Sequence, residues 1–174
     1  MIYLINSKKV VNKVRIENRW IVFLIFLISS IIVLISLNVY KNEKSVDLSE
    51  LKINDLQLNQ QFNNSDYQLN HKIKLDRYRF YTHKKYKNLI VKVQKHSNKI
   101  KGIVLINHSN ITTNFGVQIG DSIDQAIMNL GESYKKTHQG KKYKSITYFD
   151  KQNHMKLSIL YKDNSVKRLE FFSR

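Results

Sequence analysis

The chain has 174 residues and carries 30 Lys and Arg against 13 Asp and Glu, a net charge of +17, with neither cysteine nor proline. The absence of cysteine excludes a disulfide scaffold, lipoprotein processing and a thiolate metal site. The positive charge favours a polyanionic partner, although a solvated basic surface that reflects codon usage explains the composition equally well.

The first predicted element is a transmembrane helix over residues 20–40, which carry no charge and have Trp20 and Tyr40 at their ends. Such a helix would cover the roughly 30 Å hydrocarbon core of a bilayer. A cleaved signal peptide is the alternative, but the apolar run is long and no small residues follow it. We therefore predict an uncleaved signal anchor in a cell membrane.

The predicted orientation follows from charge on the two sides of this segment. Residues 1–19 contain five Lys and Arg but only Glu17 as an acid, whereas the charges just after Tyr40 nearly cancel. Positive flanks stay in the cytoplasm, so we expect a cytoplasmic basic N-terminus over residues 1–19. A linker over residues 41–50 and an extracellular domain over residues 51–174 would follow.

The predicted extracellular domain contains an internal repeat with a constant offset, which divides it into residues 51–114 and 115–174. In the second half of each copy Leu89 falls on Met155 and Ile103 on Leu169, while at the front Ile53 falls on Ile119 at the same offset. Every matched apolar position stays apolar, which favours two copies of one supersecondary unit.

The second copy predicts a helix with Asp121 as its N-cap and Gly131 at its end, because Ile123, Ala126 and Leu130 form one apolar stripe. Three strands are then expected over residues 144–149, 155–161 and 166–172. In the first copy a weaker helix starts near Asp55, and strands cover residues 77–82, 88–94 and 99–106. The predicted fold class is α+β, an N-terminal transmembrane helix followed by two tandem repeats of a helix plus a three-stranded antiparallel sheet.

Three segments carry a resemblance to a known family: YRFYTHKKYKNLIVKV from Tyr78, NKIKGI from Asn98 and GVQIGDSIDQAIMNLG from Gly116. They resemble the CAP-associated N-terminal domain of membrane-anchored CAP-superfamily (SCP-like) proteins of Gram-positive bacteria. The last segment is also similar to small modules of the beta-lactamase-inhibitor-like families. The resemblance implies a cell-envelope location and a small binding fold. Asn54 replaces the usual glycine of the family, and the CAP domain itself is absent, so no activity is implied.

Catalytic patterns are lacking, since the six histidines form no pair at helical spacing and no nucleophile or phosphate-loop motif occurs. We therefore expect no enzyme activity, no catalytic residues, no cofactor and no metal. Two clusters in which lysine alternates with tyrosine are candidates for binding a polyanion, and solvated loop tips are the alternative. The candidate residues are Lys84, Lys85, Lys87, Lys141, Lys142 and Lys144.

The sequence thus predicts a membrane-anchored cell-envelope protein with a non-catalytic extracellular binding domain. Its expected partners are an anionic wall polymer such as teichoic acid, anionic lipid, or an envelope protein. Nucleic acid is disfavoured by the predicted extracellular location. The alternative is a protein-directed regulator, such as an inhibitor or an immunity-type partner that covers an enzyme with the exposed face of its sheet.

Overall fold

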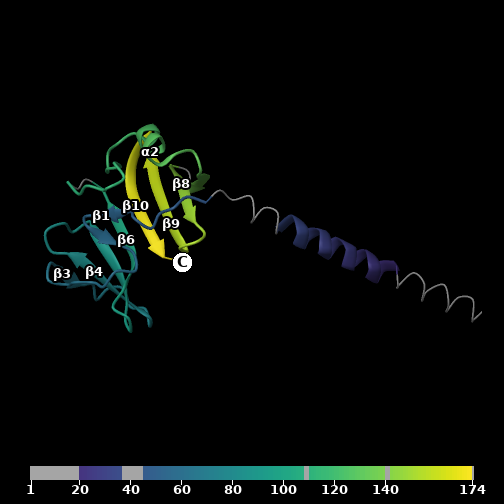
Figure 1. Cartoon of the computed structure of the whole chain (residues 1–174), viewed down its shortest axis with the longest axis horizontal. Helices are drawn as coiled ribbons and strands as arrows, with labels where there is room; N and C mark the ends of the chain where they lie inside the picture. Colours follow the sequence, from purple (N-terminus) through teal and green to yellow (C-terminus); the bar gives the residue numbers. More distant parts are fainter. Residues whose placement is uncertain (1–19, 37–44, 108–109, 140–141, 174) are drawn as a thin grey trace, which may run out of the picture. The chain divides into compact units, whose positions relative to one another are not determined.

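Figure 1 shows the computed structural model of the chain, which describes residues 20–36, 45–107, 110–139 and 142–173. The chain divides into two compact units, residues 1–43 and residues 44–174. Lys141, one of the predicted site residues, lies outside the described ranges. Each unit is taken by itself below.

The first unit contains a helix over residues 20–36. At about 1.5 Å per residue this helix rises about 25 Å, which is less than the roughly 30 Å hydrocarbon core of a bilayer. No helix within the described ranges is long and apolar enough to cross a membrane. This finding contradicts the predicted transmembrane helix over residues 20–40, the signal anchor, and the single-pass localisation with a cytoplasmic N-terminus and an extracellular domain.

The second unit is built on one antiparallel sheet of eight strands in the order β3-β4-β5-β6-β10-β9-β8-β7. A separate hairpin pairs two short strands, β1 and β2, and one helix, α2, covers residues Ile123–Leu130. The strands are β1 (Lys52–Ile53), β2 (Leu56–Gln57), β3 (Tyr67–Leu69), β4 (Tyr78–His83), β5 (Leu89–Gln94), β6 (Ile100–Ile106), β7 (Lys135–Gln139), β8 (Tyr143–Asp150), β9 (Met155–Lys162) and β10 (Ser165–Ser173).

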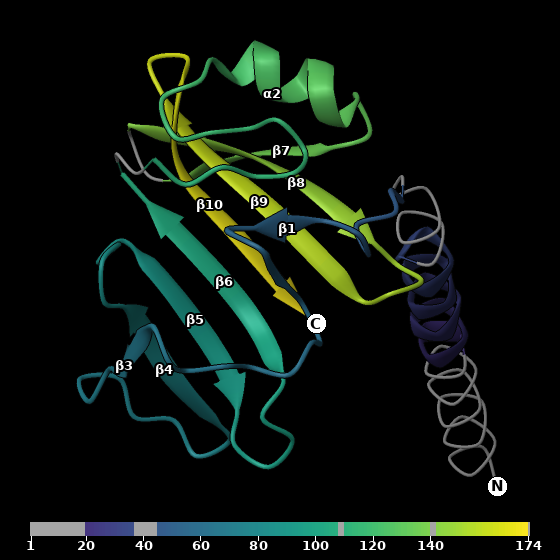
Figure 2. The same ribbon diagram turned by 60° about the vertical axis from the view of Figure 1, so that its left-hand side comes forward.

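The core lies on one face of this sheet, because apolar side chains alternate along the strands. In β9 the residues Met155, Leu157, Ile159 and Tyr161 are buried against the elements that cover the sheet. Figure 2 shows α2 and β1 over the same side of the sheet, and they contribute apolar residues such as Ala126 to the shared core. We call the opposite face, which no described element of this unit covers, the outer face.

The predicted layout of two separate helix-plus-sheet repeats is wrong. The meanders β4-β5-β6 and β8-β9-β10 join edge to edge through β6 and β10, so that a single sheet spans both halves. A three-stranded sheet with one helix would leave two edges with unpaired backbone groups, and pairing β6 with β10 removes one edge from each half. The second unit is therefore mostly an antiparallel β-sheet with one helix.

The helix predicted near Asp55 is also absent. Asn54, Asp55 and Asn59 adopt positive φ values of 50°, 63° and 65°, which interrupt a right-handed helix. The amide of Asn59 donates to Ile100 O at 2.8 Å and that of Phe62 to Asn98 O at 2.9 Å. The backbone of this segment is thus satisfied by β6 and its turn instead of by its own carbonyls.

The same strand contacts show which residues of the two halves correspond. In the second half Gly120 N donates to Val166 O and Ile123 N donates to Asn164 O, both at 2.9 Å. Val166 and Asn164 are the repeat counterparts of Ile100 and Asn98, the acceptors in the first half. Gly120 therefore takes the place of Asn59, and Ile123 that of Phe62, so the predicted match of Ile53 with Ile119 is wrong in register. The helix α2 follows in the second half only.

Candidate functional site

The predicted lysine clusters lie at the same end of the sheet. Lys84, Lys85 and Lys87 are exposed in the loop between β4 and β5, and Lys142 and Lys144 are exposed at the start of β8. The antiparallel order brings the end of β4 and the start of β8 to this end. Five strand spacings of about 4.8 Å put the two clusters about 24 Å apart. They form a row of charge, not one compact site.

The first cluster is partly engaged in local contacts. The Lys84 ammonium group donates to the Ser65 carbonyl oxygen, and the Lys85 Nζ lies 5.2 Å from the centre of the Tyr86 ring. The loop itself is shaped by His83, whose Nδ1 accepts from the backbone amides of Lys85 and Tyr86 at 3.1 and 3.0 Å. These lysines remain exposed at loop positions that are held by hydrogen bonds.

The second cluster surrounds a hollow of about 420 Å³, which we call the lysine hollow. Its lining residues are Lys142, Lys144, Tyr161, Lys162, Asp163 and Asn164. Three lysines and one aspartate thus line the hollow, and Lys162 Nζ lies 3.8 Å from Asp163 Oδ2. The exposed pair stabilises little, because water screens it. The hollow therefore keeps an excess of positive charge.

Two neighbouring turn residues build one wall of the lysine hollow. Asp163 and Asn164 have φ values of 49° and 62°, the conformation of a two-residue hairpin turn between β9 and β10. The Asn164 side chain donates to Asp124 Oδ2 at 3.0 Å, which ties the turn to the first turn of α2. The sequence analysis did not predict Lys162 as a site residue. Lys162 lies just before a predicted turn, and this position places it next to the predicted strand that contains Lys144.

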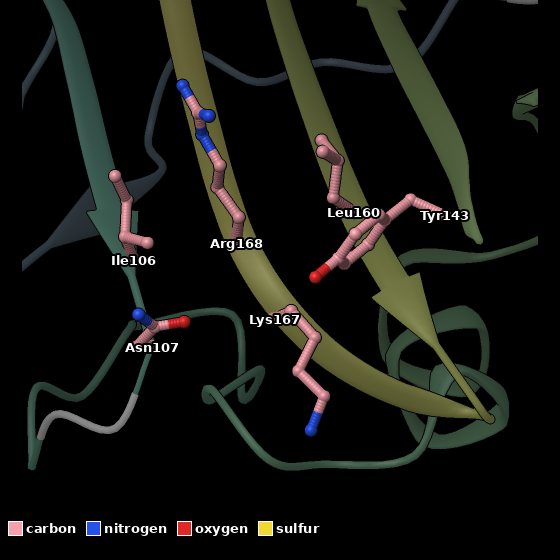
Figure 3. Close-up of a pocket in the computed structure, with 6 residues that line it drawn as sticks. All are labelled: Ile106, Asn107, Tyr143, Leu160, Lys167 and Arg168. Atoms are coloured by element: carbon pink, nitrogen blue, oxygen red, sulfur yellow. The ribbon is translucent and has the colours of Figure 1, made fainter. Parts of the chain in front are cut away.

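A second hollow of about 290 Å³ opens on the outer face, and we call it the outer hollow (Figure 3). It is lined by Ile106, Asn107, Tyr143, Leu160, Lys167 and Arg168. The Arg168 guanidinium contacts Glu170 with a distance of 2.7 Å between Nη2 and Oε1. Its Nε is buried and, within the described part of the chain, has no hydrogen-bond partner. Of these six residues, the sequence analysis included only Tyr143, as the tyrosine of its second lysine cluster.

The groups with shifted pKa values lie away from both hollows. Burial, and then the charge of Tyr134, raises the pKa of Tyr148 to about 12, and its hydroxyl donates to Gly131 O at 2.8 Å. Burial alone would raise the pKa of Asp150, but the hydrogen bonds it accepts from Leu48 and Asn153 together hold that pKa below its usual value. Both groups have structural partners, so neither is placed as a general acid or base.

A metal site is not assembled in the described ranges, which contain no group of three or more His, Asp or Glu side chains able to hold an ion. We found no family model that matches this chain, and no similar protein among the curated proteins or the solved structures. The resemblance to the CAP-associated domain therefore stays a prediction.

Proposed function

We propose that residues 44–174 form a non-catalytic binding module for a polyanion with repeated phosphate groups. The lysine hollow carries this proposal, because Lys142, Lys144 and Lys162 all line it and Asp163 is the one carboxylate among its lining residues. A phosphate group is attracted to such an excess of positive charge, and the attraction acts over about 8 Å at physiological ionic strength. A single phosphate would bind weakly at so exposed a site.

The distance between the clusters suggests why the ligand is a polymer. Lys84, Lys85 and Lys87 lie about 24 Å from Lys142 and Lys144 along the same end of the sheet. A chain of phosphates reaches both places at once, and the second contact then benefits from a high effective concentration. We therefore expect affinity to rise steeply with the length of the polymer.

The test is a binding titration with isolated teichoic acid. It compares the full chain with a variant of the full chain that carries both Lys142→Gln and Lys144→Gln. The matched control combines Lys95→Gln with Lys99→Gln, which removes the same charge from exposed positions at the opposite end of the sheet. We expect the first variant to bind about threefold to tenfold more weakly and the control to bind like the parent. Equal loss in both variants would refute a localised site.

Two further arms of the same titration identify the polyanion. Vesicles with anionic headgroups test a lipid surface, and a single-stranded oligonucleotide tests nucleic acid. Because the predicted transmembrane helix is contradicted, location no longer argues against nucleic acid. Preference for the oligonucleotide over teichoic acid at equal phosphate concentration and equal salt would move the proposal to nucleic acid.

A protein partner is the second candidate, and the outer face favours it. In the centre of this uncovered face Val104 and Leu160 are buried, at 9% and 8% exposure, and Lys92 Nζ lies 3.9 Å above the Tyr78 ring. Such a mixture of apolar and aromatic groups is typical of protein interfaces. Binding of a protein here would depend on Tyr78 and respond weakly to salt, whereas polyanion binding falls steeply as salt rises.

A further inference from the structure

The strand register relates the two halves of the sheet by an approximate two-fold axis. Val104 of β6 pairs with Glu170 of β10, its own counterpart in the repeat, and the neighbouring pairs exchange partners in the same way: Leu105 with Leu169, and Ile103 with Phe171. Repeat counterparts in β6 and β10 therefore occupy equivalent places. This relation makes each half an internal control for the other.

Both strands carry a β-bulge at the equivalent position. In β5, Lys92 pairs with Gly102, but the next residue, Val93, pairs with Ile100. Lys101 is therefore the extra residue of β6. The register between β9 and β10 shifts in the same way between Val166 and Arg168, so that Lys167 is the extra residue there. A bulge places two successive side chains on nearly the same side, here those of Lys167 and Arg168.

Five residues of the outer hollow now have counterparts in the first half. Arg168 corresponds to Gly102 and Ile106 to Phe172, by the offset that also relates Val104 to Glu170. Leu160 pairs with Arg168 as Lys92 pairs with Gly102. Ser145 pairs with Leu160, and Phe80 pairs with Lys92. The residue two positions before Ser145 is Tyr143, and the residue two positions before Phe80 is Tyr78. The counterparts of Ile106, Tyr143, Leu160, Lys167 and Arg168 are thus Phe172, Tyr78, Lys92, Lys101 and Gly102.

In the first half this place is filled by the protein itself. The Phe172 ring lies so close to Gly102 that a Cβ at that position would overlap with Phe172 Cδ1. The Lys92 ammonium lies 3.9 Å from the centre of the Tyr78 ring and 5.9 Å from that of Phe172. A cation above an aromatic ring is attracted by the negative face of that ring. The rings of Tyr78 and Phe172 and the ammonium group of Lys92 thus stabilise one another.

In the second half the same place stays open. Ile106 is smaller than Phe172 and Leu160 carries no charge, which leaves the hollow of about 290 Å³. Arg168 replaces glycine and brings a guanidinium whose Nε lacks a hydrogen-bond partner in the described residues, while Glu170 engages Nη2. A buried donor without an acceptor costs free energy. The second half therefore carries a guanidinium group where the first half carries a glycine covered by a ring.

The geometry points to a binding site for a small organic anion in the outer hollow. Figure 3 shows the Tyr143 hydroxyl directed toward β10, with the side chains of Lys167 and Arg168 extending from that strand in opposite directions. The hydroxyl supplies a donor for a carboxylate or phosphate group, and the two cations supply positive charge on either side of it. Ile106 and Leu160 supply apolar walls for a compact apolar body. The inference does not rest on the proposed polyanion site, because the lysines of that site do not line this hollow.

The test follows the methyl signals of Ile106 and Leu160 by NMR while the full chain is titrated with benzoate or phenyl phosphate, and with neutral benzyl alcohol as the uncharged control. We expect saturable shifts at these two residues with the anions only, in the millimolar range or tighter. Arg168→Gln should weaken binding about tenfold or more, since hydrogen bonds to charged groups are the strong ones. Tyr143→Phe should weaken it about threefold.

The two-fold relation supplies matched controls. In the filled half, Tyr78→Phe makes the same chemical change as Tyr143→Phe, and Lys101→Gln makes the same change as Lys167→Gln. We expect the two changes in the filled half to leave anion binding unchanged. Equal loss from both members of a pair would overturn the site. Shifts that are equally large with benzyl alcohol, or no saturable shift with either anion, would overturn it as well.

A reconstruction of the filled arrangement tests the geometry directly. Arg168→Gly combined with Ile106→Phe gives these two positions of the second half the residues of the first, and it should abolish anion binding while the remaining methyl signals stay dispersed. Retained binding in this folded double variant would refute the assignment of the donors.

A further titration distinguishes a free small molecule from the carboxylate at the end of a peptide or polymer. Its ligand is acetylated glycine, which lacks the apolar body. We expect acetylated glycine to bind more weakly than benzoate.

Discussion

Replacing Asp150 by Asn should destabilise the second unit strongly, because this carboxylate ties the chain before β1 to the end of β8. Asp150 is 2% exposed. Its Oδ2 accepts from Leu48 N at 2.9 Å and from Asn153 Nδ2 at 2.8 Å, and its Oδ1 accepts from Asn153 N at 2.8 Å. An asparagine side chain offers one acceptor oxygen, so its amide group would face a donor.

The magnitude follows from these contacts. At least one charge-assisted hydrogen bond, worth about 1.5–3 kcal/mol, is lost, and the unpaired donors add to the cost. We expect the free energy of unfolding to fall by about 2–4 kcal/mol, a large share of the roughly 5–15 kcal/mol of a typical domain. Urea denaturation of the full chain, followed by near-ultraviolet circular dichroism of its tyrosines, measures this difference.

The dependence on pH provides a second readout. Hydrogen bonds hold the pKa of Asp150 below its usual value in the folded protein, so the unfolded chain takes up the proton first. The stability that Asp150 contributes is therefore full above the unfolded pKa of about 3.9 and is lost as pH falls through the folded pKa. Asp150→Asn should flatten this acid limb.

The matched control is Asp163→Asn, the same change at a residue whose side chain is 86% exposed and whose carboxylate lies 3.8 Å from Lys162 Nζ. Asparagine tolerates the positive φ of this turn position, so we expect a change below about 0.5 kcal/mol. The reasoning about Asp150 is refuted if both variants unfold at the same urea concentration and show the same acid limb as the parent.

Three further predictions test the packing of the sheet and its helix. Gly102→Ala should lower the free energy of unfolding by about 1–3 kcal/mol, since the new Cβ meets the Phe172 ring, and Phe172→Leu in the same chain should recover part of the loss in a urea titration. Ser122→Ala removes the oxygen that accepts from Gln125 N at 3.1 Å and should cost about 1 kcal/mol by the same measurement. A chain that ends at Asn114 leaves β6 without its partner β10 and should lack a dispersed amide NMR spectrum; a native-like spectrum would show that the first half folds alone.

Local periodicity in the sequence was sufficient for the strands that face the core. The alternation of Met155, Leu157 and Ile159 predicts β9, and the corresponding pattern predicts β5, because a half-buried strand must alternate its side chains between core and solvent. The helix α2 was predicted with its end at Gly131, although Ser122, not Asp121, is the N-cap. Asp121 instead accepts from Gln118 N.

The edge strand β7 was missed for a physical reason. Its sequence KKTHQ has no apolar alternation, because it pairs with β8 alone and its lysines face solvent. Charged residues on an edge strand discourage further pairing, and they also erase the pattern that marks a strand. The candidate site shares this limit: Lys142 and Lys144 were found as a basic run, but their neighbour Lys162 comes from another strand.

The sequence by itself thus determined six of the eight strands of the sheet and that the surface is basic, because side-chain periodicity and charge are local properties. Only the tertiary structure decided that β6 pairs with β10, and with it the single sheet, the end at which the lysines gather and the two-fold register. Pairing between distant strands depends on backbone hydrogen bonds that every residue offers alike, so local pattern does not specify it. Arg168 Nε, which has no hydrogen-bond partner among the described residues, lies beside the outer hollow because that pairing sets Arg168 between Ile106 and Leu160.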